Sequence, residues 1–236
     1  KQALNGSKIS FRLQLYRATL YNCPRIMSHD ILNFVFLAFL TAGFISPSEQ
    51  DDNLKISVYY ETYCPDSINF VMNQLAPMMG EFNKYPDWLI LELIPFGFAK
   101  ETGHFKWSCQ HGPKECAGNK LDACAINELV TKQNKPLYMR LVNFIYCTMA
   151  ADNQVKAARQ CAAQTGVNYR KLMKCYKGTE GDKLLEMYEN ITASLQPPLN
   201  WVPTAVFNDK YNETENNEAQ TNLYGVVCSY MPDECK

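Results

Sequence analysis

The hydrophobic and polar positions at the start of the folded region follow first a strand pattern and then a helix pattern. Residues 54–60 (LKISVYY) alternate and are rich in β-branched and aromatic side chains, which predicts a strand. Apolar residues then recur at helical spacing from Ile68 to Phe82. Residues 88–94 (WLILELI) form a short apolar run that is typical of a buried strand. Together these segments predict a βαβ unit with parallel strands.

The remainder of the chain predicts a block of helices and then one more strand. Residues 100–119 are rich in cysteine and predict irregular structure, whereas apolar stripes predict helices at 121–131, 137–149, 155–165, 169–177 and 183–195. A short strand is expected at 205–208, a polar turn at 209–221 and a last apolar segment at 223–231. This order predicts an α/β, thioredoxin-like fold with a disulfide-rich helical insertion at about 100–198.

The amino end has the pattern of a targeting segment. The first methionine is Met27, and residues 31–45 form an uncharged apolar stretch with the length of a signal-peptide core. We therefore expect 27–48 to be a cleaved signal peptide, 1–26 to be a leader outside the mature protein, and 49–236 to be the folded domain. The alternative is a membrane anchor with the basic residues of the leader on the cytoplasmic side.

Removing this segment changes the charge and the cysteine count. The 236 residues carry a formal charge of −1, but residues 1–48 hold five of the 23 basic and one of the 24 acidic residues, so 49–236 carries −5. Such a charge excludes phosphate-driven binding to nucleic acid. Of the ten cysteines only Cys23 is removed, which leaves nine. The sequons at Asn190 and Asn212 predict glycosylation and agree with a luminal route.

Cys64 is the strongest candidate for a reactive group. It lies where the first strand meets the first helix, with Pro65 in the first turn, and a helix start favours the thiolate that attacks disulfides. Parity also favours a free Cys64, although it could instead be one more half-cystine. Four disulfides would use the other eight: Cys109, Cys116, Cys124, Cys147, Cys161, Cys175, Cys228 and Cys235. Their pairing stays open, since eight cysteines allow 105 connectivities.

The position three residues after Cys64 is occupied by Ser67. In a Cys-x-x-Cys pair the second thiol resolves the mixed disulfide and releases the reduced substrate. A serine hydroxyl can only hydrogen-bond to the thiolate. An attack by Cys64 would therefore need a second thiol from outside the chain.

The segment 109–124 (CQHGPKECAGNKLDAC) contains several residues that can bind a metal or form disulfides. A zinc site would use Cys109, His111, Cys116 and Cys124, but the spacing lacks the short paired-cysteine knuckles of structural zinc sites. In the oxidising secretory pathway such thiols form disulfides, so disulfides and no metal are expected. His111 by itself is more often a structural hydrogen-bonding residue than a general base.

This segment resembles the signature of the gamma-interferon-inducible lysosomal thiol reductase family. The matching residues are Cys109, Gln110, His111, Gly112, Glu115, Cys116, Asn119 and Cys124, and the likeness extends over about 55–235, including Tyr60-Glu-Thr-Tyr-Cys64-Pro-Asp and Val202-Pro203. The family implies a glycosylated lysosomal or secreted enzyme that reduces protein disulfides in acid. Reductase members carry the second active-site cysteine where this chain has Ser67.

The resemblance and the residues together predict a luminal thiol-disulfide oxidoreductase without a bound cofactor. Cys64 would attack disulfide-bonded or unfolded proteins, Val202 and Pro203 would offer backbone groups to an extended substrate, and glutathione or free cysteine would resolve the mixed disulfide. One alternative is a non-catalytic binding protein that captures cysteine-containing or unfolded chains. Another is a dimer linked through Cys64. No stable membrane insertion is expected after signal cleavage.

Overall fold

The computed structural model describes residues 53–82, 87–133 and 136–235. The expected leader and signal peptide lie outside these residues. All of the described residues belong to one compact unit, Asp51–Lys236. Within the described part of the chain, no helix is both long and apolar enough to cross a membrane.

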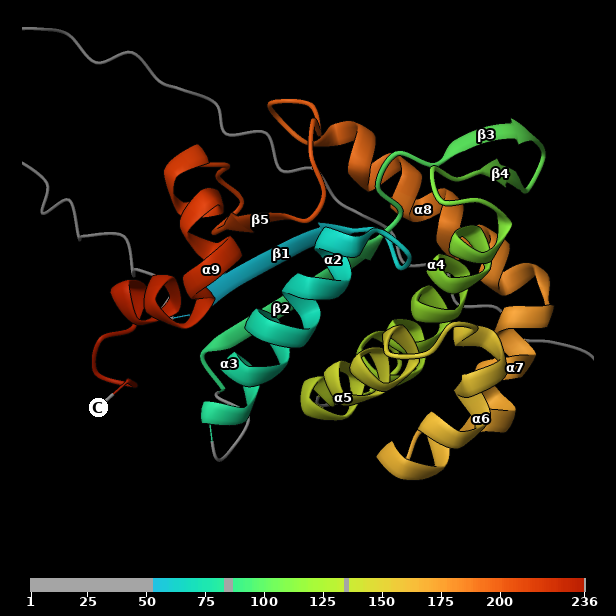
Figure 1. Cartoon of the computed structure of the whole chain (residues 1–236), viewed down its shortest axis with the longest axis horizontal. Helices are drawn as coiled ribbons and strands as arrows, with labels where there is room; N and C mark the ends of the chain where they lie inside the picture. Colours follow the sequence, from blue (N-terminus) through green and yellow to red (C-terminus); the bar gives the residue numbers. More distant parts are fainter. Residues whose placement is uncertain (1–52, 83–86, 134–135, 236) are drawn as a thin grey trace, which may run out of the picture. The chain divides into compact units, whose positions relative to one another are not determined.

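A three-stranded sheet lies at the centre of this unit (Figure 1). The middle strand β1 (Leu54–Tyr60) pairs in parallel with β2 (Leu89–Pro95), as the βαβ pattern predicted, and antiparallel with β5 (Thr204–Phe207). Most of β1 and all of β5 are buried. Consecutive residues from Ile56 to Tyr60 and throughout β5 are buried, which shows that both faces of these strands are covered.

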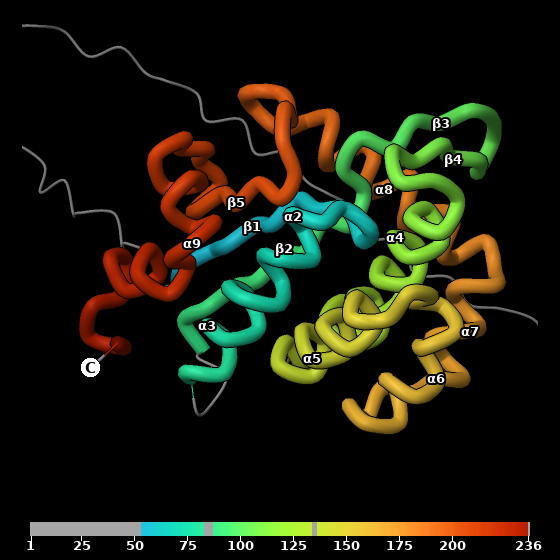
Figure 2. The backbone as a smooth tube through the Cα atoms, in the orientation of Figure 1, coloured from blue at the N-terminus to red at the C-terminus, as the bar shows by residue number. Residues whose placement is uncertain are grey.

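The helix that follows β1 consists of three consecutive segments. They are α2 (Pro65–Phe70), the π-helical turn η1 (Val71–Leu75) and α3 (Ala76–Glu81), and the backbone stays in the right-handed helical region at both junctions. Figure 2 traces this path from the end of β1 into the helix. The predicted helix is therefore confirmed, and its apolar stripe packs into the core.

Between β2 and β5 the chain forms a hairpin and a set of helices. The hairpin strands are β3 (Lys100–Gly103) and β4 (Lys106–Ser108). The helical segments are α4 (Pro113–Ile126), the π-helical turn η2 (Asn127–Thr131), α5 (Tyr138–Met149), α6 (Gln154–Thr165), α7 (Tyr169–Lys177) and α8 (Thr179–Ser194). Helices α4 and α8 pack against β2.

The prediction of irregular structure over 100–119 was wrong. Helix α4 begins inside this segment: Gly112 at its N-cap has a φ of +86°, which favours glycine, and Pro113 suits the first turn. The apolar stripe that marks most helices is absent from its first turns, because α4 buries small and polar residues there. Glu115, Gly118 and Asn119 are all inside the protein.

The expected polar turn at 209–221 was also wrong. Helix α9 (Glu213–Tyr230) occupies most of it, and the Asn212 side chain caps its start by accepting hydrogen bonds from the amides of Thr214 and Glu215. At Asn222 the backbone leaves the helical region (φ −150°, ψ 55°). Before Asn222 the buried residues of α9 are the polar Asn216 and the small Ala219, so no apolar stripe marks this part of the helix in the sequence.

The described cysteines form four disulfides and leave one free thiol. Cys109–Cys116, Cys124–Cys175 and Cys147–Cys161 lie between β2 and β5, and Cys228–Cys235 links the end of α9 to the carboxyl end. Cys64 is free and buried.

Candidate active site

Cys64 occupies the N-cap of α2, immediately after the turn that leaves β1. Its carbonyl accepts the first helical bond, from Ile68, and no side chain caps the amides of the first turn. The residue is only 7% exposed. Its thiol therefore lies at the amino end of a helical segment, where the unpaired amides and the helix dipole favour a negative charge.

Ser67 is fully buried one turn further along. Its hydroxyl oxygen accepts a hydrogen bond from the backbone amide of Glu61 at 3.3 Å. The hydroxyl is thus part of the β1–α2 turn, at the position where a resolving cysteine would stand.

The segment before β5 completes the surroundings of the thiol. The Cys64 thiol donates to the carbonyl oxygen of Val202, with 3.8 Å between sulfur and oxygen, across 138 positions of sequence. The Val202–Pro203 peptide bond is cis, and both residues are buried. The neighbouring Trp201 is 53% exposed, which makes it one of the most exposed large apolar side chains described.

The turn that leads to Cys64 is held by helix α4 and by the start of α6. Asn119 accepts hydrogen bonds from both the amide (3.0 Å) and the hydroxyl (2.9 Å) of Thr62, and Gln154 donates to the carbonyl of Thr62. A Cβ at Gly118 would lie 2.3 Å from the Thr62 hydroxyl, so only glycine permits this close approach. Asn119, which belongs to the predicted signature, thus holds the turn that leads to Cys64, although it lies 57 residues from Thr62 in the sequence.

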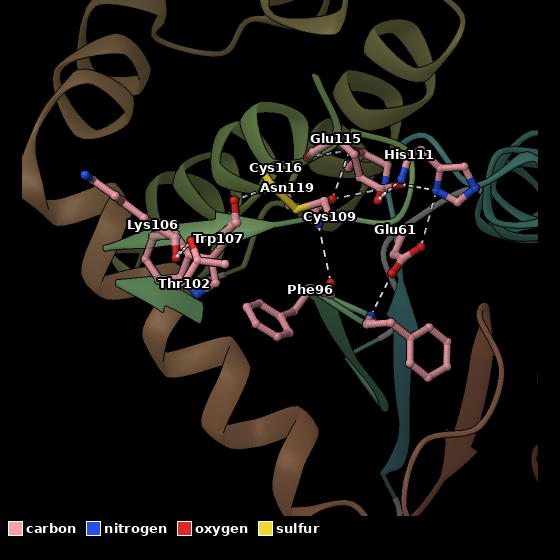
Figure 3. Close-up of a disulfide and its surroundings, with 12 residues drawn as sticks. Glu61, Phe96, Thr102, Lys106, Trp107, Cys109, His111, Glu115, Cys116 and Asn119 are labelled. Carbon is pink, nitrogen blue, oxygen red and sulfur yellow. Dashed lines mark hydrogen bonds and ion pairs between the residues drawn. A yellow bond between two sulfur atoms is a disulfide. The ribbon is translucent and has the colours of Figure 1, made fainter. Parts of the chain in front are cut away.

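A second group of polar side chains lies beside this turn. The group consists of Glu61, His111 and Glu115. One side-chain nitrogen or oxygen from each residue lies within 4.8 Å of the corresponding atoms of the other two. His111 Nδ1 is 2.6 Å from Glu115 Oε2 and 3.5 Å from Glu61 Oε2 (Figure 3). Burial raises the pKa of Glu61, and Glu115 raises it further, while the amide of Phe98 and the His111 ring act in the opposite direction.

Asp122 is a further buried acid on α4. Its Oδ2 accepts a hydrogen bond from the hydroxyl of Tyr60, at the end of β1. Burial raises the pKa of Asp122 from 3.8 to about 7, although the Tyr60 hydrogen bond works against this rise. The carboxyl group is therefore protonated in acid and loses its proton near neutrality.

The other predicted residues have distinct places. Cys109, which precedes α4, forms a disulfide with Cys116 near the start of that helix, and Cys124 forms a disulfide with Cys175 of α7. None of these sulfurs is therefore available for the zinc site that the sequence analysis considered. Gln110 is exposed in the turn before Gly112. Asn190 and Asn212 are both exposed.

Sequence reasoning missed Glu61, Thr62 and Asp122. Their neighbours come from a helix that lies about 50 to 60 positions away, so no local spacing marks them. The only sequence signal was the position of Glu61 and Thr62 in the stretch that leads to Cys64.

The fold and the free cysteine at the strand–helix junction define the class as a thioredoxin-like thiol-disulfide oxidoreductase. Among solved structures, DsbA from Chlamydia trachomatis has the same fold, with a TM-score of 0.50, 14% identity, and coverage of 76% of this chain and 85% of the other.

Sequence comparisons give the family. The model of the gamma interferon inducible lysosomal thiol reductase (GILT) family matches residues 55–165. GILT-like protein 1 of Drosophila melanogaster is 34% identical over 217 residues, which cover 87% of this chain and 84% of the relative. The gamma-interferon-inducible lysosomal thiol reductase of Carassius auratus is 31% identical, covering 76% of this chain and 69% of the relative. The chain belongs to the GILT family.

Proposed function

We propose that this protein reduces protein disulfides through Cys64 by a monothiol route. The observation that carries the proposal is a single free cysteine at the amino end of α2, with its sulfur 3.8 Å from the carbonyl oxygen of Val202. A thiolate at this helix end is a nucleophile suited to disulfide exchange.

The reaction proceeds in three exchanges. The Cys64 thiolate attacks one sulfur of the substrate disulfide, the substrate S–S bond breaks, and one substrate sulfur leaves as a thiolate that takes up a proton. A small thiol such as glutathione or free cysteine then attacks the Cys64 sulfur and releases the second substrate thiol. A second small thiol regenerates Cys64, so that two small thiols are oxidised to one disulfide while the substrate gains two electrons and two protons.

The substrate is an extended or unfolded segment that contains a disulfide. When Cys64 loses its proton, the carbonyl of Val202 loses its hydrogen-bond donor and can accept one from a substrate backbone amide. Pro203 lies beside this carbonyl, and the half-exposed Trp201 ring offers an apolar surface to the same segment. These features support binding of a chain whose backbone is accessible.

Burial of the thiol argues against a Cys64-linked dimer. Cys64 is 7% exposed, and a bridge between two folded chains would require two such sulfurs to approach to about 2 Å. A flexible substrate segment can enter where two folded surfaces cannot.

The proposed location is the lysosome or the extracellular space, with 49–236 as the mature domain after removal of a signal peptide at 27–48. Exposure of Asn190 and Asn212 supports glycosylation at both. A glycan on the side-chain nitrogen of Asn212 leaves its oxygen free to cap α9. The protonated state of Asp122 in acid supports work in an acidic lumen.

The test compares Cys64→Ser and Ser67→Cys in the reduction of a disulfide-bonded protein. Cys64→Ser is expected to lower the rate by at least about 10³-fold, because the other described cysteines are all in disulfides. Without added glutathione, the native chain should accumulate a mixed disulfide through Cys64. Ser67→Cys should release the substrate without glutathione, since the new thiol can resolve the intermediate.

Mass spectrometry of the trapped intermediate and of the released substrate thiols reads both results. Unchanged reduction in Cys64→Ser would overturn the proposal. Equal release by Ser67→Cys and the native chain without glutathione would overturn the monothiol route alone.

A further inference from the structure

The carboxylates of Glu61 and Glu115 are arranged in the same way around the ring of His111. The amide of Phe98 donates to Glu61 Oε1 at 2.7 Å, and the amide of His111 donates to Glu115 Oε1 at 3.0 Å. Each Oε2 is turned toward the same atom, His111 Nδ1 (Figure 3). Backbone groups therefore hold one oxygen of each carboxylate and leave the other directed into the space between the three residues.

The oxygen of Glu61 in this space has no hydrogen-bond partner. Glu61 is fully buried, and its Oε2 is among the few buried polar atoms in the described residues that accept no hydrogen bond. The side chain cannot easily turn away, because Gly97, at a φ of +62°, packs so closely that a Cβ there would lie 2.2 Å from Glu61 Cγ. A buried, unpaired carboxylate oxygen held in this way is costly unless a cation or a proton meets it.

We propose that Glu61, His111 and Glu115 bind a divalent transition-metal ion of the Zn²⁺ type. Two carboxylate oxygens and one imidazole nitrogen are ligands that such ions accept, and the nitrogen argues against Ca²⁺ or Mg²⁺, which prefer oxygen ligands alone. The amides of Phe98 and of His111 serve as the outer contacts that orient the carboxylates.

The two contacts of His111 need only a small movement to accept an ion. Bonds of about 2.0–2.1 Å in a tetrahedral site separate neighbouring ligand atoms by about 3.3 Å. The contact between Glu61 and His111 is already 3.5 Å, whereas that between His111 and Glu115 is 2.6 Å and must open by less than one ångström. The His111 side chain is 34% exposed, so it can turn and also leave a path for the ion and for water as a fourth ligand.

This site differs from the zinc site considered in the sequence analysis, which would use cysteines that are paired in disulfides in the structure. It joins the turn before Cys64 to the start of α4, so that the ion would connect two segments that are 50 residues apart in the sequence. The inference does not depend on the chemistry of Cys64.

The test is calorimetric titration of the folded full chain with Zn²⁺ at pH 7, followed by Co²⁺ absorption spectroscopy. We expect one Zn²⁺ per chain and a Co²⁺ spectrum without thiolate charge-transfer bands. Glu61→Gln, Glu115→Gln and His111→Asn should each weaken binding at least about tenfold, because each removes a ligand. His104→Asn, Glu186→Gln and Cys64→Ser should bind Zn²⁺ as the native chain does.

Absence of Zn²⁺ binding by the native chain would overturn the proposal and leave the cluster as a hydrogen-bonded ion pair. Loss of binding in Cys64→Ser, or thiolate bands with Co²⁺, would overturn it by assigning the metal to the thiol. Circular dichroism establishes that each variant is folded before titration. If a buried glutamate variant unfolds, His111→Asn decides, because unchanged affinity in this partly exposed position also overturns the proposal.

Discussion

Cysteine has opposite roles in two neighbouring regions of this molecule. At the junction of β1 and α2, Cys64 is unpaired, and hydrogen bonds and packing hold its surroundings. Between β2 and β5, three disulfides cross-link the hairpin and the helices. The cross-linked region also holds the region around Cys64, since Asn119 of α4 accepts a hydrogen bond from Thr62 in the turn before Cys64.

The difference shows how a thiol can stay unpaired in a chain rich in disulfides. A cysteine near Cys64 would be able to bridge it, so the turn is fixed by amide and hydroxyl groups, which do not exchange with sulfur. The disulfides lie in the helical region that holds this turn, where they stabilise its helices. Changes in the cross-linked region should therefore affect stability first, and changes at the contact between the regions should affect Cys64.

The largest stability effect is expected from removing the buried Cys124–Cys175 bridge. Changing both cysteines to serine should lower the free energy of unfolding by about 4 kcal/mol, because the bridge closes a long loop in the unfolded chain. Denaturant unfolding measures this loss. The same change at Cys228 and Cys235, seven residues apart, is the control and should cost about 2 kcal/mol. Equal losses would contradict the assignment of the main cross-link to the helical region.

Asp122→Asn should change how stability depends on pH. In the native chain the raised pKa lets folded Asp122 keep a proton that the unfolded chain has lost, so its stabilising contribution is complete below about pH 3.8 and is lost as the pH rises toward about 7. The slope reaches at most about 1.4 kcal/mol per pH unit. Asparagine cannot ionise, so the variant should lose this part of the slope between pH 4 and 7.

Unfolding curves at several pH values measure the difference between the two chains. The neighbouring Tyr60 and Tyr188 stay neutral in this range, because burial raises the pKa of both. Glu61, whose pKa is also raised, contributes to both chains alike. Parallel pH profiles for the native chain and the variant would show that Asp122 does not titrate in this range.

Asn119→Ala tests the contact between the two regions. The change leaves the buried amide and hydroxyl of Thr62 without their acceptor, which should cost about 1–3 kcal/mol. The loosened turn should also expose Cys64, so that iodoacetamide labels it several-fold faster. The exposed Asn217→Ala on α9 is the control. If the Asn119→Ala variant were less stable but its Cys64 were labelled at the native rate, the Asn119–Thr62 contact would contribute to stability alone.

Trp201→Ala should have the smallest effect and should act only on substrate binding. Removing the exposed ring is expected to raise KM for an unfolded substrate a few-fold, with kcat and the labelling of Cys64 unchanged. Tyr146→Ala, an exposed aromatic change on α5, should leave KM as it is. A fall in kcat without a change in KM would remove Trp201 from the proposed substrate surface.

Much of the architecture could be predicted because its signals are local. The βαβ unit followed from apolar periodicity in neighbouring segments, and Cys64 followed from its position before Pro65 and from the odd number of cysteines in 49–236. The start of α4 and the first part of α9 were missed, since the residues buried there are small or polar.

The sequence by itself determined the strand–helix junction, the one unpaired cysteine of the described residues and the family. Only the tertiary structure decided which cysteines pair and which acids gather near Cys64. Local hydrophobic patterns select helices and strands, but pairing and clustering depend on side chains that meet across long separations. Cys124 meets Cys175 only where α4 packs against α7, and Glu61 meets His111 only where the start of α4 lies beside the end of β1.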